Sequence, residues 1–207
     1  GTHDEYDAVI FGTGFDLSIP FLDDEIRDIL DLDTEHADLY RHTFHPDLPG
    51  LAFLGMWDQS GGYFVPIELQ ARWVAYTWSG AVPAASTEDL REGIAEYRAR
   101  RGQSQKTRMN LIALEFARAA GVEPDLAKHP SLQRALLFGP LAPVSFRLDG
   151  HDALADAEER FSREAQAFGC ILSDELSPRE RSYLQMVAEA RSDETLHAIA
   201  STIPAGR

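Results

Sequence analysis

Two glycine-containing loops are the segments of this sequence best suited to hold a ligand. Gly12-Thr13-Gly14 follows an apolar run over residues 7–11, and Asp58-Gln59-Ser60-Gly61-Gly62 lies between another apolar run and a helix expected from Pro66. Strand, glycine-rich loop and helix in this order direct unpaired backbone amides and the positive helix end toward the space above a sheet, where an anion or an electron-rich ring would be stabilised. The same order also occurs as a plain strand-to-helix connection, and the pattern leaves both interpretations open.

The first loop carries only part of the fingerprint that binds dinucleotides. The motif G-x-G-x-x-G would require glycine at position 17, which is Leu17, and Pro20 follows where a helix should be running. Ligands of open parallel sheets nevertheless lie beyond the carboxyl ends of the strands. We therefore expect a turn that a cofactor can approach closely, without a complete phosphate site.

Other residue types that could do chemistry give weaker patterns. His42 and His45, with His36 nearby, suggest a metal site. Their segment alternates like a strand and turns at a proline, so we favour histidines that face solvent or form hydrogen bonds, and we expect no metal. Neither Ser60 nor Ser145 lies in the G-x-S-x-G elbow of a hydrolase.

Composition limits the classes of partner. The chain has 34 acidic and 19 basic residues, a formal charge of −15, so we expect neither nucleic acid nor an anionic membrane surface as a partner. It contains no run of about eighteen apolar residues, and we predict no membrane span. Cys170 is the sole cysteine, which excludes an intrachain disulfide and fits a cytoplasmic location.

Hydrophobic periodicity predicts the elements that position the two loops. Buried strands are expected over residues 7–11 and 51–54, and a half-buried strand over residues 39–44. A helix should begin at Pro66 and end at Gly80, because proline suits a first turn and glycine suits a helix end. Further helices are expected over residues 23–32, 87–101, 110–120, 131–138, 154–168 and 177–190, with Thr87 as an N-cap and a capping box at Ser177–Glu180.

Three segments resemble one known family, the flavin-containing monooxygenases, in the family's own order. Residues 9–16, Val-Ile-Phe-Gly-Thr-Gly-Phe-Asp, resemble its F-A-T-G-Y strand and turn. Residues 50–78 resemble the strand and helix that close its FAD domain, and residues 135–148 resemble its Gly-Pro…Phe-Arg-Leu segment. Gly12 replaces the more common alanine of the turn, a change that keeps the close backbone approach.

The resemblance implies an α/β fold, the C-terminal part of a flavoprotein with two dinucleotide-binding domains. The family's G-x-G-x-x-G for FAD, its F-x-G-x-x-x-H fingerprint and its glycine motif for NADPH are absent from this sequence, which begins at Gly1. We therefore interpret the chain as a portion that lacks the N-terminal half of the enzyme and is inactive by itself. Residues 1–82 would hold the end of the NADPH domain and the closing strands and helix of the FAD domain, and residues 83–207 a helical C-terminal region.

The resemblance also implies the chemistry. Members use FAD and NADPH, and a flavin C4a-hydroperoxide passes one oxygen atom to a soft nitrogen or sulfur nucleophile, as in a dimethylaniline monooxygenase. We expect a small amine or sulfide substrate and assign no catalytic side chain, because the flavin performs the reaction. The alternatives are a Baeyer–Villiger monooxygenase, whose distinguishing fingerprint lies upstream, and a non-catalytic helical module that binds a partner and no flavin.

By the same resemblance, the second loop lies beside the flavin ring. We expect Gln59 to reach the flavin or the nicotinamide carboxamide, Asp58 to hold a ribityl hydroxyl or to cap the loop, and Arg72 to form a structural ion pair. The two glycine loops should meet at neighbouring strand ends. The candidate cofactor-binding residues are Gly12, Thr13, Gly14, Asp58, Gln59, Ser60, Gly61 and Gly62.

Overall fold

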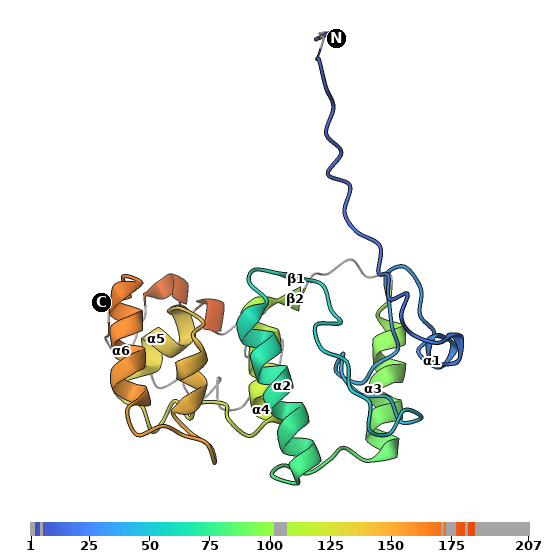
Figure 1. Cartoon of the computed structure of the whole chain (residues 1–207). Coiled ribbons are helices and arrows are strands. Elements are labelled where there is room, and N and C mark those ends of the chain that lie inside the picture. Colours follow the sequence, from blue (N-terminus) through green and yellow to red (C-terminus); the bar gives the residue numbers. More distant parts are fainter. Residues whose placement is uncertain are drawn as a thin grey trace. The chain divides into compact units, whose positions relative to one another are not determined.

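The computed structural model describes residues 3–4, 6–101, 107–170, 172, 177–180 and 182–184. Helices make up nearly all of the regular structure in this part of the chain (Figure 1). The elements in order are α1 (Asp24–Ile29), β1 (Gln59–Ser60), α2 (Phe64–Ser79), α3 (Thr87–Ala99), β2 (Thr107–Arg108), α4 (Met109–Ala119), the short 3₁₀ helix η1 (Pro130–Leu132), α5 (Gln133–Phe138), the 3₁₀ helix η2 (Pro143–Arg147) and α6 (Ala157–Ala167). None of the described helices has the length and apolar character that crossing a membrane requires.

The chain forms two compact units, each assembled from two separate stretches. The first unit contains residues 1–56 and 85–105, and the second contains residues 57–84 and 106–207. The division at residue 82 that the sequence suggested separates parts of the domains of a longer enzyme. These two units do not test that division, which stays a prediction.

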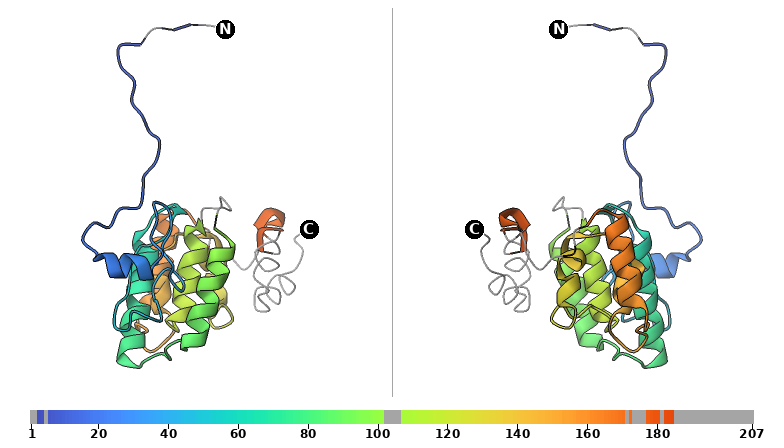
Figure 2. Two further views of the ribbon diagram at one scale, coloured as in Figure 1. Left: turned by 90° about the vertical axis from the view of Figure 1, so that its right-hand side faces the viewer. Right: turned by 90° about the vertical axis from the view of Figure 1, so that its left-hand side faces the viewer.

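The strands expected over residues 7–11 and 51–54 are absent, so this part of the sequence prediction is wrong. Residues 7–11 form an extended trace that pairs with no described strand (Figure 2), and the side chains of Ile10 and Phe11 are 95% and 81% exposed. A buried parallel strand needs hydrogen-bonded neighbours and a covering layer on each face. No described segment supplies either to these residues.

The third expected strand, over residues 39–44, is a turn. Arg41 and His42 have φ angles of +45° and +56°, in the left-handed region that reverses the chain. Tyr40 and Phe44 consequently face each other in a single antiparallel bridge. Burial in this turn does not follow the apolar and polar alternation of the sequence, because Leu39 and the polar Thr43 are buried while Tyr40 and Phe44 are partly exposed.

The first unit is organised around a buried carboxylate. Asp38 is fully buried and forms ion pairs with Arg98 and Arg101 at the end of α3. A buried charge is stable only when it is paired and hydrogen-bonded, so both arginines have a structural role here. The neighbours of Asp38 in the sequence, Ala37 and Leu39, belong to a small apolar cluster with Leu30 and Phe53.

The second unit contains the packed helix pair α2 and α4, which lie side by side. Trp73 of α2 stacks on Phe116 of α4 with ring centroids 6.1 Å apart and an angle of 28° between the rings. Ala113 and Ala117 are fully buried on the same face of α4, and such small side chains allow the two backbones to approach closely. A second apolar cluster joins α5, η2 and α6 and includes Leu132, Ala135, Val144, Ala157, Phe161 and Ala165.

The helix ends follow local sequence signals closely. The predicted helix from Pro66 is confirmed as α2, which starts two residues earlier at Phe64 and ends at Gly80, whose φ of +76° is left-handed. The capping box at Ser177 and Glu180 is also confirmed, with both reciprocal hydrogen bonds present. The rest of the helix predicted over residues 177–190 lies outside the described residues beyond position 184.

The N-cap of α3 is Ser86 rather than the predicted Thr87. The Ser86 hydroxyl accepts a hydrogen bond from the Asp89 amide, and the Asp89 carboxylate accepts one from the Ser86 amide. Ser86→Ala should therefore lower the free energy of unfolding by about 1 kcal/mol, as measured by urea denaturation followed by circular dichroism. The matched control is Thr87→Ala at the next residue, and an equal loss for both variants would contradict the assignment of the cap.

Candidate functional site

The loop after Trp57 is held in shape by hydrogen bonds of the Gln59 side chain. The Trp57 indole N–H donates to Gln59 Oε1 at 2.7 Å, and Gln59 Nε2 donates to the carbonyl oxygen of Gly62 at 2.6 Å. Gln59 is only 5% exposed, so its amide faces into the loop. The Gln59 amide links the two ends of the turn, and the expected contact of Gln59 with the flavin or the nicotinamide stays a prediction.

The backbone of the same loop is fixed at Tyr63. The Gln59 amide donates to the Tyr63 hydroxyl at 3.2 Å, and that hydroxyl lies 3.5 Å from Asp58 Oδ1. Asp58 is exposed, so its carboxylate contacts the Tyr63 hydroxyl and is otherwise open to solvent. This geometry supports the loop-capping role among the two roles that the sequence left open for Asp58.

Gly61 and Gly62 pack on Met109, the first residue of α4. The Gly62 amide donates to Met109 Sδ at 3.1 Å. Gly61 has a φ of +107°, and a Cβ at this position would lie 3.0 Å from Met109 Cβ and 3.1 Å from Sδ. Glycine is therefore required at position 61 both by backbone conformation and by the close approach of the methionine.

The starts of α2 and α4 are brought together by a short parallel pair of strands, of which β1 lies in this loop. β1 and β2 run parallel, with Gln59 opposite Thr107 and Ser60 opposite Arg108, and each strand leads into a helix of the packed pair. Both α2 and α4 start without a side-chain cap, and the first turn of α2 has no acidic residue. The positive ends of both helix dipoles therefore lie at this edge of the second unit.

The first glycine loop belongs to the other unit. Gly12, Thr13 and Gly14 are exposed, Gly14 has a φ of +101°, and a Cβ at Gly12 or Gly14 would meet nothing within 4 Å. No strand precedes this turn, so the expectation that both glycine loops follow neighbouring strands is wrong. Their role in binding a cofactor stays a prediction.

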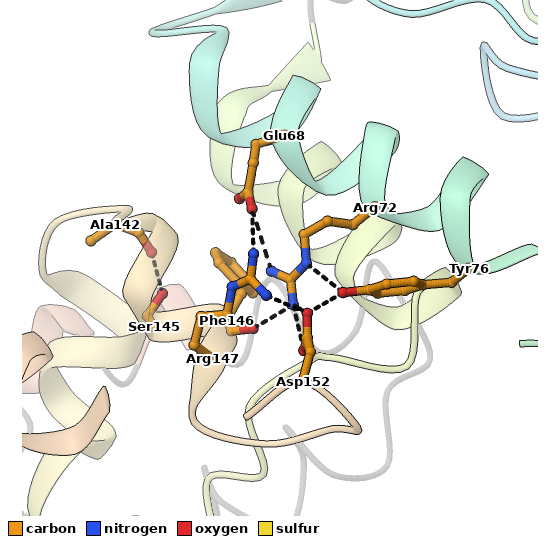
Figure 3. A network of polar contacts seen from close by, with 8 residues as sticks. All are labelled: Glu68, Arg72, Tyr76, Ala142, Ser145, Phe146, Arg147 and Asp152. Carbon is orange, nitrogen blue, oxygen red and sulfur yellow. Dashed lines mark hydrogen bonds and ion pairs between the residues drawn. The ribbon is translucent and has the colours of Figure 1, made fainter. Parts of the chain in front are cut away.

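A charged network joins α2 to the segment around η2 (Figure 3). Arg72 Nη2 donates to Asp152 at 2.8 and 2.9 Å and to the carbonyl oxygen of Phe146 at 2.9 Å. The Tyr76 hydroxyl and the Arg147 guanidinium also bind the Asp152 carboxylate. The structural role predicted for Arg72 is confirmed, since its side chain is only 8% exposed and directed away from the glycine loop toward Asp152.

Glu68 extends this network toward the start of α2. Its Oε1 lies 3.2 Å from Arg147 Nη2 and 3.7 Å from Arg72 Nη1. Glu68 and Arg72 are separated by one helical turn, and the two opposite charges are therefore neighbours on one face of α2. The network balances two carboxylates against two guanidinium groups, which is the arrangement that a partly buried charge cluster requires.

Asp152 has a perturbed acidity. Burial alone would raise the pKa of its carboxyl, but the hydrogen bond from Tyr76 and the positive charges of Arg72 and Arg147 outweigh this effect and lower the pKa below 3.8. The carboxylate consequently remains ionised well into the acid range. Sequence reasoning missed Asp152 and Tyr63, since no local motif marks either residue.

The histidines have separate environments. His42 packs edge-to-face on Tyr97 with ring centroids 5.4 Å apart, and burial lowers its pKa to about 4. His45 Nδ1 accepts a hydrogen bond from the Asp47 amide. Within the described part of the chain, no group of three or more His, Cys, Asp or Glu side chains is arranged to hold a metal ion.

The model of the flavin-binding monooxygenase-like family matches residues 1–165. Dimethylaniline monooxygenase (N-oxide-forming) 2 from Rattus norvegicus is 34% identical over 161 residues, and flavin-containing monooxygenase 5 from Oryctolagus cuniculus is 32% identical over 161 residues; both alignments cover 71% of this chain and 30% of the relative. Flavin-containing monooxygenase 2 from Homo sapiens is 33% identical over 165 residues, which cover 72% of this chain and 30% of the relative. The chain therefore spans about a third of the length of these relatives.

The lowered pKa of Asp152 gives a pH-dependent prediction. A carboxyl with a lowered pKa in the folded state contributes stability above its unfolded pKa of 3.8, and that contribution is lost as the pH falls through the folded value. Asp152→Asn should therefore destabilise the protein at pH 7 and make the free energy of unfolding fall less steeply with pH below about 4. Urea denaturation across the pH range measures both effects.

The matched control for this prediction is Asp156→Asn. Asp156 is an exposed carboxyl whose ion pair with Arg160 lies outside the network, so this change should leave the acid limb unchanged. An acid limb that is equally steep in Asp152→Asn and the parent protein would contradict the role of Asp152.

Proposed function

Because this chain belongs to the flavin-binding monooxygenase-like family, we propose that it supplies the flavin-ring end of the cofactor site in an enzyme that uses FAD and NADPH to oxygenate a small amine or sulfide. The observation that carries this proposal is the loop from Asp58 to Gly62, whose backbone is held rigidly at the uncapped start of α2. This loop lies within the segment that resembles the cofactor-facing part of the family. The remaining parts of the site would come from a longer protein.

The residues of the loop suit one end of a flavin. Flavin, when bound, would supply the redox chemistry: it would take electrons from NADPH and, with molecular oxygen as co-substrate, pass one oxygen atom to the amine or sulfide while the other leaves as water. The first turn of α2 has neither an acidic residue nor a side-chain cap, and Pro66 has no N–H, so the amides of Phe64 and Val65 and the positive helix end would stabilise negative charge on the pyrimidine side of the ring. Phe64, which begins α2 and is 91% exposed, offers an apolar surface beside these amides.

Gln59 takes a different role in the proposal from the one expected at first. Its carbonyl oxygen accepts from Trp57 and its amide nitrogen donates to Gly62, so the side chain positions the loop backbone. Gly61 packs on Met109 and the Gly62 amide donates to Met109 Sδ, so this methionine holds the loop in the conformation that it would present to the ring. Rigid placement of this kind removes the reorganisation that a mobile loop would need when the cofactor binds.

The sequence contains no pyrophosphate fingerprint, and this limits what the chain can bind. The phosphates of FAD require a glycine motif and a helix start of the first strand unit, for which the chain offers only the partial Gly12–Gly14 turn. We therefore propose that FAD, NADPH and substrate are held together with an N-terminal portion of the enzyme. The name of the Rattus norvegicus relative specifies N-oxide formation, which favours oxygenation of nitrogen over the Baeyer–Villiger alternative.

Gln59→Ala in the longer enzyme tests this proposal. Removing the hydrogen bonds to Trp57 and Gly62 should loosen the loop at a cost of about 1–3 kcal/mol. FAD should stay bound while NADPH oxidation becomes uncoupled, with more hydrogen peroxide and less oxygenated product per NADPH consumed. Parallel assays of NADPH, peroxide and product give the coupling ratio.

Gln133→Ala is the matched control for this experiment. Gln133 also donates one side-chain hydrogen bond to a backbone carbonyl, that of Leu126, but it lies on α5 and takes no part in the glycine loop. Its coupling ratio should equal that of the parent enzyme. Equal coupling in Gln59→Ala and Gln133→Ala would count against the loop as part of the flavin site.

A further inference from the structure

The described residues that follow position 165 include a short helical segment outside the family match. Residues 178–180 and 182–184 are helical, and with Ser177 they form what we name the C-terminal segment. Its start is fixed by the capping box, in which the Ser177 amide donates to Glu180 Oε2 at 2.6 Å and the Glu180 amide donates to the Ser177 hydroxyl at 3.3 Å. The segment thus has a defined beginning and a defined helical face.

That face packs on α5. Glu180 accepts hydrogen bonds from Arg134 at 3.0 and 3.2 Å, with both side chains mostly buried. The Tyr183 ring packs against Phe138 with centroids 6.0 Å apart, and Leu184 is 2% exposed. An ion pair, an aromatic contact and a buried leucine on one helical face indicate specific docking.

The same segment reaches the first turn of α4. Asn110 Nδ2 donates to the Tyr183 hydroxyl at 3.3 Å, and Asn110 directly follows Met109, on which Gly61 and Gly62 rest. A short series of contacts therefore connects Tyr183, through Asn110 and Met109, to the glycine loop. All of these residues belong to the second unit.

We propose that the C-terminal segment is a positioning element that fixes the start of α4 and, through Met109, the glycine loop, with Tyr183 and Glu180 as its positioning residues. The segment lies beyond the residues that match the family model, and it contacts the start of α4, on which the glycine loop rests. Its docking does not depend on the proposed function, whereas its effect on a flavin would rest on that function.

Hydrogen exchange of the full chain without flavin tests the proposal. Tyr183→Phe keeps the ring and removes only the hydroxyl that meets Asn110. Loss of this one hydrogen bond should speed amide exchange over residues 109–113 and 59–62 by about fivefold, while α6 exchanges at the parent rate. A chain ending at residue 176 should show the same local change to a greater extent.

Two variants separate positioning from general stability. Asn110→Asp can still accept a hydrogen bond from Tyr183 and should keep the parent exchange rates, whereas Tyr6→Phe removes an exposed hydroxyl of the first unit and should have no effect. Parent exchange rates at residues 59–62 and 109–113 in both Tyr183→Phe and the shortened chain would overturn the proposal, as would equal acceleration in α6. These outcomes are independent of flavin binding and leave the proposed function to its own test.

Discussion

The buried contact between Arg72 and Asp152 is the constraint on which the arrangement of the second unit depends. Arg72 is carried by α2, and its guanidinium group is satisfied by the Asp152 carboxylate and the Phe146 carbonyl (Figure 3). Neither charge could remain buried without the other, because desolvation of an unpaired ion costs several kcal/mol. The interaction therefore fixes α2 against the segment after η2, and it joins the second and third stretches of sequence that resemble the family.

A fixed α2 determines where the glycine loop can lie. The loop leads directly into α2, while its glycines rest on the first residue of α4, and α2 and α4 pack along their length. The loop thus lies beside two helix starts, whose dipoles carry partial positive charge. Gln59 bonds to Trp57 and to Gly62 within the loop and keeps the loop backbone in one conformation.

Sequence patterns predicted the parts of this structure that have local causes. Proline and glycine signals gave the bounds of α2 within two residues, and the position of Arg72 inside this helix indicated a structural ion pair. Asp152 lies 80 residues from Arg72, so no spacing rule could pair them. The apolar run over residues 7–11 predicted a strand, but a strand also requires neighbours that the described chain does not provide. The inward orientation of Gln59 depends on Trp57 and Gly62 together and has no signature in the sequence.

The most direct test of the account is amide hydrogen exchange in the longer enzyme, measured with and without FAD. In the proposed complex, the flavin ring lies against the loop and the start of α2. Binding of FAD should therefore slow exchange of the amides of Gly61, Gly62 and Phe64 more strongly than exchange in α6, which is part of the separate apolar cluster. Protection that leaves residues 58–64 unchanged while FAD is demonstrably bound would contradict the central claim.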